Sequence, residues 1–191
     1  MEREPTGVAK HLEDHLGPVQ NGREFALPGQ APFFVVEFAD RPTRGARTFA
    51  TLGLSEHVLA QPAGGSALRQ ELLFAAGNAD PSEAALLLAA VARDVTASAT
   101  SLDRGAVLGP HGPLFPGSHL EALYCAPPVY FPDGLAKYGG MTPPVVLVWL
   151  VPLTAKEASF ASRRGFAAFE ALLQEQDPDL LDIQRPEMAL G

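Results

Sequence analysis

The segment 51–57, TLGLSEH, carries the residue types of a nucleophilic hydrolase site, because Ser55 stands between a glycine and a histidine. A nucleophile elbow has the form Gly-x-Ser-x-Gly, in which small residues relieve a strained strand-to-helix turn. Here His57 occupies the second small position, and the following segment is interrupted by a proline and two glycines. We therefore expect Ser55 to cap a turn at the end of a strand. Hydrolysis with His111 or His119 as the base remains the alternative.

The histidines His11 and His15 are four residues apart, a spacing that can bind a metal ion on one face of a helix. The zinc-protease motif requires glutamate directly after the first histidine, where this chain has Leu12. No Walker-type phosphate loop and no dinucleotide fingerprint follows a predicted strand. We expect a solvated helix face, no metal and no cofactor.

Two other reactive side chains lie within predicted strands. Glu71 is on the polar side of segment 67–76 and could act as a general acid, or it could pair with Arg69 or a charge on a neighbouring strand. Cys125 has no basic neighbour, and we expect a buried apolar group rather than a thiolate. Since no catalytic set emerges, the sequence favours a protein that binds and is not an enzyme.

Composition limits the kinds of partner that the chain can bind. The 191 residues carry a net charge of −8, and the 14 Lys and Arg residues are scattered, which disfavours nucleic-acid binding. No run of 18 apolar residues occurs, so we expect no membrane span. The N-terminal sequence lacks the regions of a signal peptide, and the single cysteine fits a reducing compartment. We expect a cytoplasmic protein with a protein partner.

The pattern of apolar residues predicts both strands and helices. Strands are predicted at 33–38, 47–54, 67–76, 119–126 and 144–153, and the last is apolar on both sides, as in a central strand. Helices are predicted at 6–16, after the N-cap Asp80, and after the capping box of Thr154 and Glu157, with Gly165 dividing the last region in two.

The remaining segments are predicted to be irregular. Residues 103–118 are rich in proline and glycine, and Asp177, Asp179 and Asp182 with Arg185 form a charged tail over 177–191. Strands and helices mix without a regular βαβ alternation. The expected fold is a single α+β domain over 1–191, with a central mixed, mostly antiparallel sheet flanked by helices.

The order of these segments resembles that of the suppressor-of-fused (SUFU) domain family. The matching pieces are an N-terminal helix ending in glycine, TFATLGLS (48–55), RQELLFAA (69–76), VLGPHGPL (107–114), LEALYCAPP (120–128), VWLVPLTAKEASF (148–160), FAAFEALL (166–173) and DIQRPEM (182–188). The likeness spans almost the whole chain, and the chain is similar to the bacterial, single-domain type.

This resemblance implies an α+β domain that acts through protein–protein interaction. Animal members restrain a zinc-finger transcription factor by gripping a peptide that adds as a strand, whereas bacterial members resemble immunity proteins of polymorphic toxin systems. Where animal members have Gly-Asp-His, this chain has Gly109-Pro110-His111, so no animal site residue is transferred. The resemblance favours an immunity protein that neutralises a toxin domain. A regulatory scaffold for an endogenous protein, or a serine- or metal-dependent hydrolase, is the alternative.

The predicted recognition surface combines loop 105–118 with segment 127–138. Aromatic side chains on loops often anchor interfaces. The candidate binding residues are His111, Phe115, Tyr130, Phe131 and Tyr138. In the competing interpretation, these aromatic side chains pack beneath their own loops.

Overall fold

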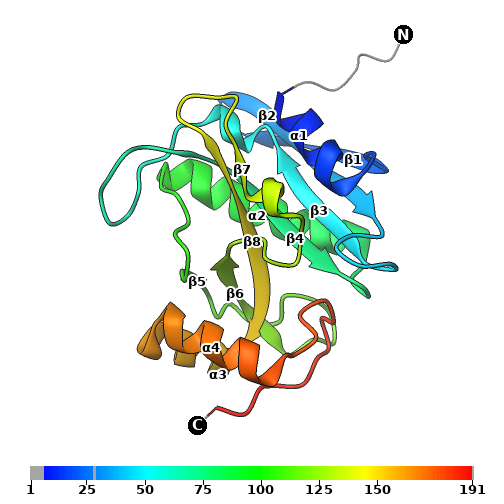
Figure 1. The fold of residues 1–191 in the computed structure, drawn as a ribbon, viewed down its shortest axis with the longest axis vertical. Helices are drawn as coiled ribbons and strands as arrows, with labels where there is room; N and C mark the ends of the chain where they lie inside the picture. The colour runs from blue at the N-terminus through cyan, green and yellow to red at the C-terminus, as the bar shows by residue number, and fades with distance from the viewer. Residues whose placement is uncertain (1–6, 28, 191) are drawn as a thin grey trace.

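The computed structural model describes residues 7–27 and 29–190, and these build one eight-stranded sheet with helices on both faces (Figure 1). The strands are β1 (Asn21–Leu27), β2 (Gln30–Ala39), β3 (Arg47–Leu52), β4 (Arg69–Ala76), β5 (Val107–Leu108), β6 (Leu120–Ala126), β7 (Lys137–Tyr138) and β8 (Val145–Thr154). Their order is β1-β2-β3-β4-β8-β6-β5, and β7 pairs with β8. Only β4 and β8 are parallel among these pairs. The predicted α+β fold with a mixed, mostly antiparallel sheet is confirmed.

Helices divide between the two faces of the sheet. Helix α2 (Pro81–Ser98) packs on one face, and α1 (Gly7–Leu16), α3 (Ala155–Arg164) and α4 (Phe166–Gln176) pack on the other. Two short 3₁₀ turns, η1 (Leu54–Glu56) and η2 (Asp133–Ala136), complete the elements. Within the described part of the chain, no helix is both long enough and apolar enough to cross a membrane.

Strand β4 is buried on both faces, so segment 67–76 does not have the solvent-facing polar side that its sequence suggested. It runs between β3 and β8, so Leu72 and Phe74 join the core beneath α2 while Leu73 and Ala75 join the opposite core. Glu71, placed on the polar side from its sequence, is fully buried. The alternation of polar and apolar residues predicted the wrong exposure for β4, because its polar side chains are buried with hydrogen-bond partners inside the protein.

The predicted helix ends are present. Asp80 accepts hydrogen bonds from the backbone N–H groups of Ser82 and Glu83, and the Thr154–Glu157 capping box opens α3. Gly165, with a φ of 81°, separates α3 from α4. The N-terminal helix is described from Gly7 onward, and the predicted first residue of that helix lies outside the described residues.

Candidate functional site

Ser55 is a buried part of a turn and does not form a nucleophile elbow. The expectation that it caps the turn is wrong, because the N-cap of η1 is Gly53. Ser55 lies in η1, is 2% exposed, and donates its backbone N–H to the Glu71 carboxylate at 3.0 Å. The same carboxylate accepts from the backbone of Gly53, also at 3.0 Å, and from the hydroxyl of Thr51. Gly53 has a φ of 109°, and a Cβ there would lie 3.4 Å from the Phe33 Cα. Glu71 therefore holds the end of β3 in place.

The expected pairing of Glu71 with Arg69 is wrong. Arg69 instead donates to the backbone carbonyls of Ser55 and Glu56, at 2.7 and 2.9 Å. Burial raises the pKa of Glu71, while the hydrogen bonds from Thr51, Ser55 and Gly53 act in the opposite direction. The group has a structural role, because it is enclosed by the turn that it stabilises.

One of the paired histidines attaches α1 to η2, and the other bonds within α1. His11 donates from Nε2 to the Leu135 carbonyl at 3.0 Å, and His15 donates from Nδ1 to the His11 carbonyl at 2.8 Å. Their rings lie 4.5 Å apart and are partly buried, which corrects the expectation of a solvated helix face. Across residues 7–27 and 29–190, no group of three or more His, Cys, Asp or Glu side chains could hold a metal ion.

Two of the predicted binding residues are core residues in this structure. Phe115 is 1% exposed and stacks on Phe74 with ring centroids 5.5 Å apart, and Phe131 is 6% exposed and meets the Trp149 ring edge-on. The rings of Phe115 and Phe131 therefore offer little surface to a partner, because other side chains of the same chain already cover them. For these two residues the competing interpretation of packing beneath the loop describes the structure.

The other three predicted binding residues do not form one cluster. His111 is exposed, and its backbone N–H bonds to Glu121, near the end of β8 where α3 begins. Tyr138 pairs with Val145 at the opposite end of β8 and lies against His11. At about 3.3 Å of rise per strand residue, these ends are roughly 30 Å apart. Of the five candidates, Tyr130 alone combines an exposed side chain, at 41%, with a place in the lining of the groove described next.

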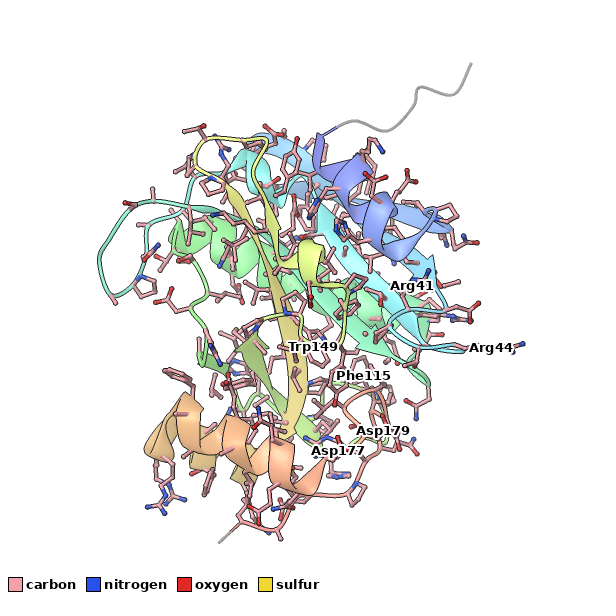
Figure 2. All side chains as sticks on the ribbon, viewed as in Figure 1. Arg41, Arg44, Phe115, Trp149, Asp177 and Asp179 are labelled. Carbon is pink, nitrogen blue, oxygen red and sulfur yellow. The ribbon has the colours of Figure 1, made fainter. Side chains whose placement is uncertain are left out.

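The groove lies between α4, strands β6 and β8, and segment 127–130, with a cavity volume of about 210 Å³. We call it the Trp149 groove. Val129 and Tyr130 are 71% and 41% exposed, and the Tyr130 ring packs on that of Trp149 with centroids 4.9 Å apart. Trp149 itself lies on β8, where Figure 2 labels it. Leu173 of α4 contributes to the opposite wall. The groove thus has apolar walls and a rim of exposed apolar side chains.

Most charged groups in the Trp149 groove already have partners. Arg104 donates through Nε to Glu170 at 3.0 Å and forms a second contact with the same carboxylate, and Tyr124 donates its hydroxyl to Glu170 at 2.9 Å. Arg104 lowers the pKa of Glu170, whereas burial, followed by Glu170, raises that of Tyr124. The Arg104–Glu170 pair leaves no net charge here.

Asp177 supplies the unbalanced charge of the Trp149 groove. It follows α4 with a φ of 41°, is exposed, and its carboxylate has no hydrogen bond or ion pair within the described residues (Figure 2). Asp179 lies near Tyr130 too, but it borders a neighbouring hollow that Arg44 also lines. The pKa of Tyr130 is raised by burial and then by Asp177 and Asp179, as expected beside a negative rim.

Trp149 was missed as a functional candidate by the sequence analysis. Its side chain is 1% exposed, and among the described residues its indole N–H has no hydrogen-bond acceptor. A buried donor left without an acceptor costs about 1–3 kcal/mol. The available signal was a tryptophan within an aliphatic strand, because a buried indole N–H normally finds a partner.

The mixed sheet with helices on both faces places the chain in the α+β class of single-domain folds. Within that class, the sequence matches the family described as Suppressor of fused protein (SUFU) over residues 29–186. The chain belongs to this family. No curated protein sequence matches it.

Solved structures share the fold at low sequence identity. A SUFU homologue from Neisseria gonorrhoeae FA 1090 is 18% identical with a TM-score of 0.73, and 96% of each chain is covered. Sufu in the Sufu–Fu complex is 19% identical with a TM-score of 0.68, over 87% of this chain and 82% of that one. Drosophila Suppressor of Fused is 18% identical with a TM-score of 0.63, over 81% of this chain and 42% of that one.

Proposed function

We propose that this chain is a non-enzymatic protein-binding module that acts as an immunity protein, neutralising a toxin domain in the bacterial cytoplasm. Family membership supports the binding role, since a relative of the same fold forms the Sufu–Fu complex. The buried state of Ser55 argues against the serine-hydrolase alternative.

The observation that carries the proposal is the pair of exposed apolar side chains, Val129 and Tyr130, at the rim of the Trp149 groove. The Tyr130 ring rests against the buried Trp149 ring, which places its exposed part at the rim. Aromatic residues that flank a desolvated pocket are frequent anchors of protein interfaces. The net charge of −8 would speed encounter with a basic partner.

Affinity purification from the native cell tests this function. Tagged wild-type protein is compared with Val129→Lys, and with Val58→Lys as the matched control, because Val58 is 47% exposed and lies outside the Trp149 groove. We expect a toxin domain, identified by mass spectrometry, to be captured by wild type and Val58→Lys, and at least about tenfold less of it to be captured by Val129→Lys.

The other outcomes separate the alternatives. An endogenous protein captured in the same variant-dependent way contradicts immunity and supports the regulatory scaffold. A partner retained equally by Val129→Lys and Val58→Lys contradicts binding through this surface.

A further inference from the structure

We propose that the Trp149 groove binds one lysine or arginine side chain of a partner polypeptide, and that a backbone carbonyl of the same segment accepts the indole N–H of Trp149. This inference rests on the proposed binding function and names the chemistry that the groove recognises. Four features of the groove lead to it.

The size of the groove fits a side chain better than a metabolite. Its volume of about 210 Å³ lies below the range of about 300–1,000 Å³ that is typical of small-molecule sites. A single long side chain, with the rest of the partner lying across the exposed rim, would fill such a space.

The walls of the groove suit the apolar stem of a lysine or arginine. Val129, Tyr130 and Leu173 line it, and long basic side chains bury their methylene groups on such surfaces while the charged end remains near water. The partly exposed ring of Tyr130 adds a face on which a cation can rest.

The charge of the groove selects a cation. Three lining residues have formal charge, and two of them, Arg104 and Glu170, neutralise each other. The third, Asp177, is exposed at the rim without an ionic partner among the described residues. A positively charged group from outside would complete the set, whereas an acidic segment would meet unbalanced negative charge.

The unpaired indole N–H indicates that the occupant is a polypeptide and not a free amine. Trp149 lines the groove, and its Nε1 has no acceptor within the described residues. An ammonium group has only donors and cannot satisfy this nitrogen. A peptide segment supplies both the cation and carbonyl oxygens, and the exposed Tyr130 side chain can turn aside to admit an acceptor.

The single tryptophan of the chain makes the test direct, because one indole N–H signal reports on the groove. ¹⁵N-labelled full-length protein is titrated at low salt with acetyl-Gly-Gly-Arg-Gly-Gly-amide. The controls are the same peptide with Glu in place of Arg, and 1,5-diaminopentane as a free amine. We expect a saturable downfield shift of the indole N–H with the Arg peptide only.

Variants then test the charge. Asp177→Asn should weaken binding of the Arg peptide by about two- to fivefold, as expected for a rim charge, and asparagine tolerates the left-handed backbone at this position. Asp94→Asn, on α2 at the opposite face of the sheet, is the matched control and should bind as wild type does. The proposal is overturned if the Arg peptide fails to saturate, if the Glu peptide or the diamine shifts the signal equally, or if Asp177→Asn has no effect.

Failure of this inference can be distinguished from failure of the proposed function. If wild type captures the native partner and Val129→Lys does not, but Asp177→Asn binds it as tightly as wild type, then the binding function stands and the basic occupant is wrong. If the peptide binds as expected but no native partner depends on Val129, then the groove chemistry stands and the proposed function is wrong.

Discussion

Replacing Arg185 by methionine should destabilise the protein strongly, because it leaves a buried carboxylate without its counter-ion. Arg185 and Glu157 are 1% and 0% exposed at their side chains, and their ion pair is 2.6 Å long. Arg185 also donates to the Pro152 carbonyl at 3.1 Å. These contacts anchor the C-terminal tail, from which Asp177 and Leu180 reach the Trp149 groove.

The magnitude follows from the burial of both groups. Breaking a buried ion pair by removing one partner costs about 3–5 kcal/mol, against a total stability of roughly 5–15 kcal/mol for a domain. After the change, Glu157 retains hydrogen bonds from the backbone of Thr154 and Met188, at 3.0 and 2.9 Å. These bonds keep the expected loss near the lower end, at about 3 kcal/mol.

Urea denaturation followed by the fluorescence of Trp149 measures the loss as a free energy of unfolding. Adding Glu157→Gln to Arg185→Met should recover about 1 kcal/mol or more, because it removes the stranded charge. Lys156→Ala is the control, since the Lys156–Glu187 pair is 77% and 33% exposed and is expected to contribute less than about 1 kcal/mol. If Arg185→Met costs no more than Lys156→Ala, then the anchoring role assigned to the pair is refuted.

Three further predictions concern other buried groups. Because burial raises the pKa of Glu71, its contribution to stability is present below about pH 4.5 and is lost as pH rises through the folded-state pKa. In urea titrations, Glu71→Gln should therefore gain stability relative to wild type as pH rises from about 4 to about 8. A difference in unfolding free energy between the two proteins that stays constant over this range would contradict the prediction. Phe115→Ala should cost about 3–5 kcal/mol in the same assay, and a cost below about 1 kcal/mol would show that the ring is not a core residue. Burial raises the pKa of the Cys125 thiol to about 12, so a maleimide should label it in urea but not in native protein, and rapid native labelling would disprove its burial.

Local patterns in the sequence were sufficient for most elements of the fold. The cap at Asp80, the capping box of Thr154 and the apolar run of β8 each depend on neighbouring residues, and each is present in the structure. Strand β1 was not predicted, because it lies at the sheet edge and buries only Phe25 and Leu27. A strand with most side chains in water carries little alternation to detect.

The site was harder to predict, because it depends on contacts between distant residues. A loop position suggested that Phe115 was exposed, but the ring packs on Phe74, about 40 residues earlier in the chain. Tyr130 lies on an irregular segment, as predicted, whereas its ring contact with Trp149 joins that segment to β8 and cannot be deduced from neighbouring residues. Pairing of Arg185 with Glu157 likewise joins the tail to α3 and leaves no local signature.

Isothermal titration of the captured partner tests the central claim, that the rim of the Trp149 groove binds a protein, most directly. The comparison is between Tyr130→Ala and Phe34→Ala, because the two aromatic side chains are 41% and 39% exposed and Phe34 lies on β2, outside the groove. We predict that Tyr130→Ala raises the Kd at least about tenfold while Phe34→Ala leaves it within about twofold of wild type. Equal Kd values for wild type and Tyr130→Ala would contradict the claim.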